Sequence, residues 1–256
     1  MLRRVLTYLD APGPLAFAHR GGAAEGDENT TEAFARAIGL GYRYVETDVH
    51  ATADGVAVIF HDPTLRRVTG ESGRIADLSW ADLASVRVGG AAVVPRLDDV
   101  LGAWPQVRFN IDVKADGGVE PTVATVARAG ANDRVLLASF SDARLARLRA
   151  LTEGRVATGL GMRAVARLRL ASLHGRPLRL PESVVAAQVP PRYGRVPVVD
   201  RRFLDYCHRL GLQVHVWTID EPAQMHDLLD RGVDGIMTDH VGLLRDVYRS
   251  RGHWAA

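Results

Sequence analysis

The stretch VRFNIDVKADGGVEPTVATVARAGANDRVLLASF, residues 107–140, contains one complete repeat of the pattern that organises this chain. It begins with a strand-like run at 107–114, in which apolar and polar residues alternate, and it ends with a second apolar run at 134–140. Between them, VEPTVATVARAG has the spacing of an amphipathic helix. Two strands joined by a helix pair in parallel, so this stretch predicts a βαβ unit.

The same alternation recurs along the 256 residues and predicts an α/β protein. A doubly wound sheet would usually carry a glycine-rich phosphate loop near its first strand, and Gly21-Gly22 lacks the G-x-G-x-x-G spacing. Eight parallel strands in about 250 residues fit a (β/α)8 (TIM) barrel. We therefore predict a single barrel domain over residues 1–256, with strands at 15–19, 43–50, 107–114, 134–140, 155–161, 183–190, 212–220 and 234–239.

One segment interrupts the alternation after the strand-like run VAVIF. Residues 62–96 make a connection of about 35 residues, which is longer than the loops that usually follow barrel strands. The segment contains TG, SG and GG turn signals and Trp80, whereas a disordered linker would have low complexity. We predict a small inserted subdomain near the mouth of the barrel.

Composition excludes several classes of protein. The net charge of +2 is too small to indicate a nucleic-acid partner. Cys207 is the single cysteine, so no intramolecular disulfide can form, and a buried, inert thiol is expected. The first 22 residues include Asp10, Pro12 and Pro14, which break the apolar run that a signal peptide needs. Because no apolar run reaches the roughly 18 residues that span a bilayer, a cytoplasmic location is expected.

Carboxylates stand inside two of the predicted strands. Glu46 and Asp48 are two residues apart and point to the same side of a strand, and Asp112 lies in another strand. Three carboxylates near the carboxyl ends of barrel strands would form a site for one hard divalent cation, Mg²⁺ or Ca²⁺. The alternative is a structural network in which Arg20 or Arg43 pairs with these carboxylates.

Two histidines are expected beside the carboxylates. His19 ends the first predicted strand, at the barrel end where such folds gather their active sites. After Asp48 the chain reverses through Asp54-Gly55, a hairpin signal. If these two residues form the turn, Asp48 lies opposite His61, about 5 Å away. One histidine alone is more often structural, but two aimed at one carboxylate site indicate a pair that exchanges protons near neutral pH.

The chain resembles the glycerophosphodiester phosphodiesterases in a series of motifs that covers nearly its whole length. They are HRGG at 19–22, ENTTEAF at 28–34, ETDVHATADGVAVIFHDPTLRRVTGESG at 46–73, FNIDVK at 109–114, VHVWTID at 214–220 and GVDGIMTDH at 232–240. The resemblance implies metal-dependent hydrolysis of a small glycerophosphodiester to sn-glycerol 3-phosphate and an alcohol. In that reading Glu46, Asp48 and Asp112 hold the metal, and His19 and His61 are the acid and base.

The same resemblance implies the substrate contacts. Arg20 and Lys114 would contact the phosphate, Glu28 would hydrogen-bond a catalytic neighbour, and Trp217 would wall the glycerol pocket or simply be part of the core. Asn29 or Thr30 would cap the first helix. The nucleophile, either water or the glycerol 2-hydroxyl, stays open.

The chain departs from the family pattern at two places. Gly26-Asp27 stands where a proline is usual, and the third metal carboxylate, often Glu, is Asp112, whose shorter arm could shift the metal or admit a water ligand. Similar barrels also suggest a lysophospholipase D-like or other lipid phosphodiesterase, or a barrel that binds phosphodiesters without catalysis. The basic and apolar run at 162–181 is either a solvated helix face or a surface that docks on an anionic membrane.

Overall fold

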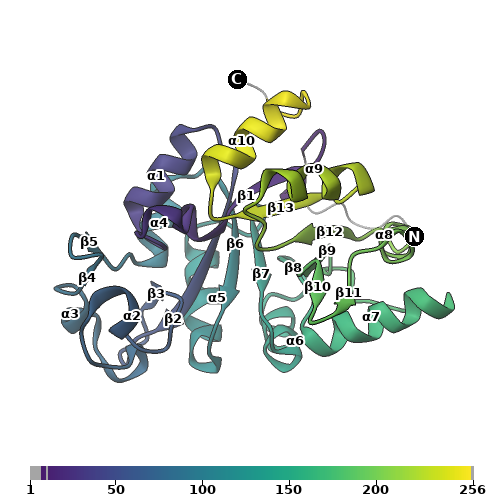
Figure 1. Cartoon of the computed structure of the whole chain (residues 1–256). Coiled ribbons are helices and arrows are strands. Elements are labelled where there is room, and N and C mark those ends of the chain that lie inside the picture. Colours follow the sequence, from purple (N-terminus) through teal and green to yellow (C-terminus); the bar gives the residue numbers. More distant parts are fainter. Residues whose placement is uncertain (1–6, 10, 255–256) are drawn as a thin grey trace.

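A parallel barrel wall occupies the centre of the computed structural model, which describes residues 7–9 and 11–254 (Figure 1). Within these residues, eight strands pair in the order β8-β7-β6-β2-β1-β13-β12-β9. These strands are β1 (Leu15–Ala18), β2 (Tyr44–Ala51), β6 (Arg108–Val113), β7 (Val135–Ala138), β8 (Ala157–Thr158), β9 (Ala186–Val189), β12 (Gln213–Val216) and β13 (Gly235–Thr238). Each lies inside one of the predicted strand ranges or within a residue of its end, and the barrel prediction is confirmed.

The ring closes between its two end strands with little backbone pairing. Thr158 of β8 forms an isolated parallel bridge with Val184, just before β9. The amide of Thr158 donates to the carbonyl of Ser183 at 2.7 Å, and the amide of Val185 donates to the carbonyl of Thr158 at 3.1 Å. β8 is only two residues long, so this seam is the sparsely bonded side of the wall.

Helices cover the outside of the wall. They are α1 (Thr31–Gly39), α4 (Leu97–Ala103), α5 (Val119–Arg128), α6 (Asp142–Leu151), α7 (Met162–His174), α8 (Arg201–Arg209), α9 (Pro222–Arg231) and α10 (Val241–Ser250). Cys207 is buried in α8, as predicted. In the part of the chain that the structure describes, no helix is long and apolar enough to cross a membrane.

Alternate side chains of the barrel strands face opposite sides, the hydrophobic core on one side and the cavity on the other. In β6, Phe109, Ile111 and Val113 join the large hydrophobic cluster between the wall and the helices. The intervening Asn110 and Asp112 line the cavity inside the barrel. β2 follows the same rule, because its polar residues Glu46 and Asp48 line that cavity too. Alternation along a strand therefore turns the carboxylates inward.

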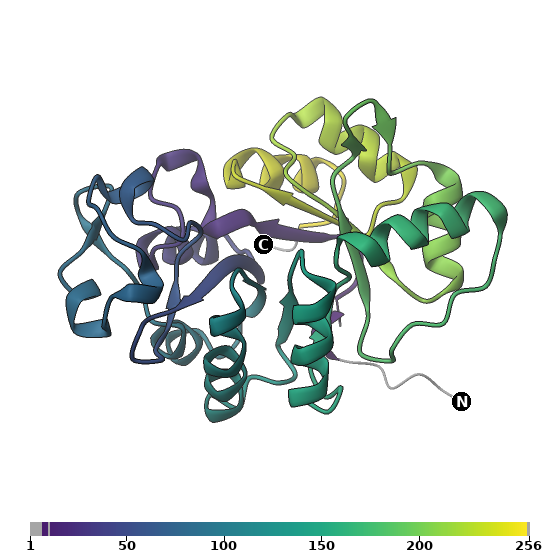
Figure 2. The ribbon, with the colours of Figure 1, turned by 90° about the horizontal axis from the view of Figure 1, so that it is seen from below.

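The segment 62–96 contains short elements with their own hydrophobic cluster. They are α2 (Arg66–Thr69), α3 (Trp80–Leu83), β4 (Arg87–Val88) and β5 (Ala92–Val93). Leu65, Ile75 and Leu83 of this cluster are fully buried, and they pack with Val58 and Phe60 from the end of the hairpin. Figures 1 and 2 show these elements on one side of the barrel, with α7 and the β10–β11 hairpin (Arg192–Tyr193 and Val196–Pro197) on the other.

The predicted hairpin after Asp48 is antiparallel, but its predicted register is wrong by one residue. β2 pairs with β3 (Ala57–Ile59) so that Ala51 faces Ala57, and the amide of Phe60, rather than of His61, donates to the carbonyl of Asp48. The turn has three residues, not two. The amide of Gly55 donates to the carbonyl of Thr52, and Gly55 adopts φ +80°, as in a type I turn followed by a left-handed residue.

Candidate functional site

A cavity of about 740 Å³ opens inside the barrel. Eight of the nine site residues predicted from the sequence line it: His19, Arg20, Glu46, Asp48, His61, Asp112, Lys114 and Trp217. Glu28 lies outside this lining, behind Arg20. His61 reaches the cavity despite the shifted register, because it follows the end of β3 and its direction is set by the loop after the strand.

Three carboxylates meet two cations at the polar end of the cavity. Asp48 and Asp112 are direct partners on neighbouring strands. The Lys114 ammonium lies 3.0 Å from a carboxylate oxygen of each. The guanidinium Nε of Arg20 is 3.4 Å from Asp48 Oδ2, and the backbone amide of Arg20 donates to Glu46 Oε2 at 3.0 Å. The predicted pairing with Arg20 is therefore present, whereas Arg43 is exposed on the outside.

Burial shapes the charges of the three carboxylates. Burial and the neighbouring Asp48 raise the pKa of Glu46 to about 7. Burial likewise raises the pKa of Asp112. Asp48 is buried as well, but Lys114 and Arg20 outweigh that effect and lower its pKa. Glu46 and Asp112 therefore hold a proton more tightly than exposed carboxyl groups do, whereas Asp48 is the carboxylate that the two cations keep ionised.

The donor set fits a hard divalent cation. Carboxylate oxygens are the ligands such ions prefer, and Asp112 Oδ1 is buried with no hydrogen-bond partner in the described part of the chain. In this structure the Lys114 ammonium lies between Asp48 and Asp112, next to the oxygens that would bind the ion. Over residues 7–9 and 11–254, no three His, Cys, Asp or Glu side chains form a group that could hold a metal ion as they stand.

His19 has a carboxylate on each side. Its Nδ1 lies 2.6 Å from Asp239 Oδ1, and its Nε2 is 3.8 Å from Glu46 Oε2. Burial lowers the pKa of His19, but Glu46 and Asp239 together raise it above the usual value. A carboxylate that accepts from Nδ1–H fixes the tautomer in which Nε2 can exchange a proton.

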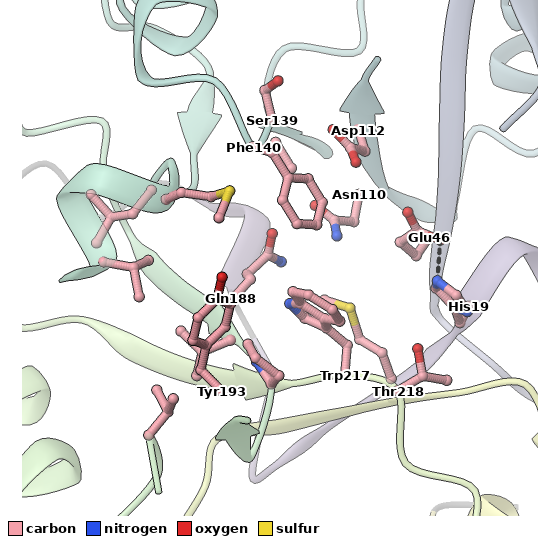
Figure 3. Close-up of a pocket in the computed structure, with 18 of the residues that line it drawn as sticks. His19, Glu46, Asn110, Asp112, Ser139, Phe140, Gln188, Tyr193, Trp217 and Thr218 are labelled. Atoms are coloured by element: carbon pink, nitrogen blue, oxygen red, sulfur yellow. Dashed lines mark ion pairs between the residues drawn. The ribbon is translucent and has the colours of Figure 1, made fainter. Parts of the chain in front are cut away.

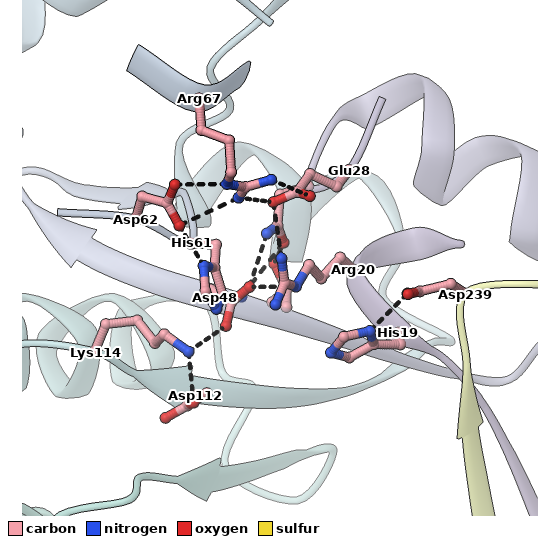
Figure 4. Close-up of polar contacts among 12 residues, drawn as sticks. His19, Arg20, Glu28, Asp48, His61, Asp62, Arg67, Asp112, Lys114 and Asp239 are labelled. Carbon is pink, nitrogen blue, oxygen red and sulfur yellow. Dashed lines mark hydrogen bonds and ion pairs between the residues drawn. The ribbon is translucent and has the colours of Figure 1, made fainter. Parts of the chain in front are cut away.

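His61 is held in the same way. Its Nδ1 lies 2.6 Å from Asp62 Oδ1 (Figure 4). Sequence reasoning missed both partners, Asp62 and Asp239. The HD pair at 61–62 carried a signal for Asp62. Asp239 follows the last barrel strand, so the barrel order that places β13 beside β1 could have brought it to His19.

Asn29 is a further site residue, and its role differs from the predicted cap. Thr30 caps α1, accepting from the amide of Ala33. Asn29 instead donates from Nδ2 to Asp48 Oδ2 at 2.8 Å and accepts from the hydroxyl of Thr47. Asn29 and Arg20 both have positive φ, 60° and 51°. Such backbone conformations are strained outside glycine and often occur at functional sites.

One arginine of the segment 62–96, Arg67, contacts residues that hold the site in place. Arg67, on α2, donates to both carboxylate oxygens of Glu28, at 2.9 and 2.6 Å, and to Asp62 at 2.6 and 3.2 Å. Glu28 accepts from Arg20 Nη1 at 3.0 Å. Figure 4 shows Arg67 between these two carboxylates. Arg67 thus connects the orientation of His61 with that of Arg20.

Replacing Arg67 by methionine is expected to lower kcat about tenfold, because Asp62 and Glu28 lose the donor that orients them, and a small misplacement of reacting groups is costly. KM should change less, since Arg67 lies outside the cavity lining. Steady-state kinetics measure the split. Arg66→Met, the exposed neighbour on the same helix, is the matched control. Equal kcat values in the two variants would contradict the positioning role.

Trp217 stands at the carboxyl end of β12, half-buried, in the cavity wall. Its ring lies 5.5 Å from the ring of Phe140, in an edge-to-face arrangement. Figure 3 shows these two rings between the polar residues His19, Glu46 and Asn110 and the more distant Tyr193. The aromatic pair therefore separates the polar end of the cavity from a second region.

Comparison with known proteins gives one family. The model of the glycerophosphoryl diester phosphodiesterase family matches residues 19–243. A probable glycerophosphodiester phosphodiesterase of Mycobacterium tuberculosis is 44% identical, with 96% of this chain and 95% of that protein covered. A human lysophospholipase D is 26% identical, with 90% of this chain and 84% of that protein covered.

A solved structure shares the fold. It is that of an Oleispira antarctica phosphodiesterase in complex with its product sn-glycerol-3-phosphate, with a TM-score of 0.78 and 22% identity. The likeness covers 93% of this chain and 97% of the other.

Proposed function

Because this chain belongs to the glycerophosphoryl diester phosphodiesterase family, we propose that its cavity hydrolyses glycerophosphodiesters with one divalent cation and two histidines. The products would be sn-glycerol 3-phosphate and a free alcohol. One observation carries the proposal. In a single cavity, two histidines each backed by an aspartate accompany three carboxylates and two cationic side chains.

The cation would be held by Glu46, Asp48 and Asp112. When bound, it would neutralise charge on the phosphate oxygens and thereby lower the barrier to attack at phosphorus. The unpartnered oxygen of Asp112 supports this assignment. The Lys114 ammonium, which now lies between Asp48 and Asp112, would share the negative charge of the phosphate instead.

The chain's own residues supply the proton transfers. Each histidine has its Nδ1 at a carboxylate, so Nε2 is the atom available to the substrate. One histidine takes the proton of the attacking water or glycerol 2-hydroxyl, and the other gives a proton to the oxygen of the departing alcohol. Arg20 and Lys114 bind the phosphate oxygens and stabilise the charge that develops on them.

Removal of divalent cations is expected to abolish release of glycerol 3-phosphate from glycerophosphocholine and glycerophosphoethanolamine. Addition of Mg²⁺ or Ca²⁺ should restore it, because the ion would supply the positive charge that neutralises the phosphate oxygens. An enzyme-coupled assay of glycerol 3-phosphate measures both steps. Full turnover after exhaustive chelation would contradict metal dependence. Folded protein that releases nothing with either ion would instead favour a barrel that binds phosphodiesters without cleaving them.

A further inference from the structure

A buried histidine outside the candidate catalytic group contacts one of the polar side chains of the cavity. His215 on β12 is fully buried, and its ring centroid lies 4.8 Å from that of Phe17. Gly235 leaves room for the ring, because a Cβ there would lie 2.9 Å from His215 Cδ2. Burial lowers the pKa of His215 to about 3, so the ring is neutral at neutral pH. A neutral imidazole has one nitrogen that donates and one that accepts.

Two glutamines decide which nitrogen of His215 carries the proton. Nε2 lies 2.9 Å from Gln213 Oε1, which is an acceptor, so Nε2 donates. Nδ1 then keeps its lone pair and accepts from Gln188 Nε2, 3.3 Å away. Gln188 is the direct partner of His215 on the neighbouring strand β9. The tautomer of His215 therefore fixes the carboxamide of Gln188 with its amino group toward the ring.

The carbonyl oxygen of Gln188 is left without a donor. Gln188 lines the cavity (Figure 3), and in the described part of the chain no donor reaches its Oε1, which stays accessible. Gly159, directly after β8, leaves space for this oxygen, since a Cβ there would lie 3.3 Å from it. Gly159 does not have a positive φ, so its backbone does not require glycine. Oε1 is thus an oriented hydrogen-bond acceptor in the cavity.

We infer that Gln188 selects substrates that carry a hydroxyl or N–H donor on one of the two groups esterified to the phosphate. This inference rests on the proposed function and adds a specificity-determining residue to it. An acceptor that is oriented in advance loses little freedom when a donor binds. A site built around such a hydrogen bond discriminates against an analogue that lacks the donor, because the buried acceptor is then left unpaired. The donor belongs either to the departing alcohol or to the glycerol group.

Head-group donors are tested with a methylation series in the metal-loaded enzyme. Glycerophosphoethanolamine, its N-methyl and N,N-dimethyl derivatives and glycerophosphocholine keep the same charge while the N–H donors are lost one at a time. If the head group supplies the donor, kcat/KM should fall about tenfold when the last N–H is lost. Release of glycerol 3-phosphate is measured for each member.

Glycerol donors are tested with an analogue of glycerophosphoethanolamine that lacks the terminal hydroxyl of glycerol. The analogue keeps the 2-hydroxyl, so attack by either nucleophile stays open. If glycerol supplies the donor, the fall of about tenfold in kcat/KM should occur here and not along the methylation series. Release of ethanolamine is measured, because the phosphate product differs from glycerol 3-phosphate.

Gln188→Met separates a lost hydrogen bond from crowding. Methionine keeps the length of the side chain but is only a weak acceptor, so the fall caused by the missing donor should shrink to about twofold or less. A purely steric effect of the added methyl groups would persist in the variant. Gln224→Met is the matched control, because Gln224 is exposed on α9 and lies outside the cavity lining. The control should keep the parental discrimination.

Gln213→Met tests the role of His215 from outside the cavity lining. Without the acceptor at Nε2, the ring can adopt the other tautomer and donate from Nδ1, which turns over the carboxamide of Gln188. The discrimination should then weaken as it does in Gln188→Met. Nitrogen-15 NMR of labelled histidine reports the tautomer directly, and His215 of the parental protein should be protonated at Nε2 alone.

The outcomes separate the inference from the proposed function. A fall in one arm that Gln188→Met and Gln213→Met both reduce and Gln224→Met preserves supports the inference and identifies the group that carries the donor. Equal kcat/KM values in both arms, a fall that Gln188→Met leaves unchanged, or His215 protonated at Nδ1 overturns the inference and leaves the proposed function standing. Failure of the folded protein to cleave any of these substrates overturns the proposed function, and the inference with it.

Discussion

Alanine in place of His19 or His61 is expected to lower kcat by roughly 10²–10⁴-fold, the usual contribution of a positioned acid or base. Each side chain lines the cavity, and an aspartate oxygen lies 2.6 Å from its Nδ1. Affinity for the divalent cation should change little, because the proposed ligands are carboxylates. Pre-steady-state and steady-state turnover of glycerophosphocholine measure the loss.

The chain offers a matched control for this experiment. His208 is also paired with an aspartate, Asp234, at 2.8 Å, but it lies on α8 and is 41% exposed. His208→Ala should therefore keep the parental kcat. Parental turnover in both the His19 and the His61 variants would contradict the acid and base assignment. A loss confined to one of them would leave that histidine as the single proton-transfer residue.

Replacing Asp48 by asparagine is expected to have the second large effect, about 10³-fold in kcat/KM, because it removes charge from the centre of the electrostatic site. Asp48 is 2% exposed and lies within contact distance of Lys114, Arg20 and Asn29. Asparagine keeps the shape of the side chain but not its charge. Titration calorimetry with Mg²⁺ or Ca²⁺ should show weaker binding in parallel with the loss of turnover.

Asp98→Asn serves as the control for charge removal, since Asp98 pairs with Arg96 at the surface. Thermal unfolding of both variants separates loss of the site from loss of the fold. If Asp48→Asn bound the cation as tightly as the parent and turned over at the same rate, Asp48 would be neither a ligand nor an electrostatic component of the site. The structural pairing with Arg20 and Lys114 would then be its whole role.

The fold could be predicted because its information is local. Each barrel strand is a short apolar run bounded by turn or helix signals, and the repeat of strand and helix leaves few topologies. The predicted register of the hairpin was wrong for an equally local reason. Asp54-Gly55 was taken as a two-residue turn, whereas Ala53 joins it and Gly55 closes a three-residue turn in the left-handed conformation. Both turns use the same glycine signal.

The sequence predicted those site residues that belong to a local sequence motif. The carboxylates and histidines lie in recognisable strand ends, and all of them line the cavity. Asp62 directly follows His61 and had a local signal, but Asp239 and Arg67 are brought to the site by tertiary structure. Asp239 lies 220 positions from His19, and Arg67 reaches Glu28 across 39 positions from an inserted helix. No spacing rule connects residues at such distances.

Backbone hydrogen bonding is unevenly distributed around the barrel wall, so regions of the wall should differ in how readily they tolerate mutation. β2 and β6 share six paired residues and carry the carboxylates, whereas β8 has two residues and meets the β9 side at the Thr158–Val184 bridge. Regions with sparse backbone pairing open at lower free energy and tolerate change more readily. Phe140, Leu160 and Met162, which line the cavity, follow β7 and β8 on that sparsely paired side. Mutations there can redraw the range of accepted substrates over evolutionary time while the reacting groups stay in place.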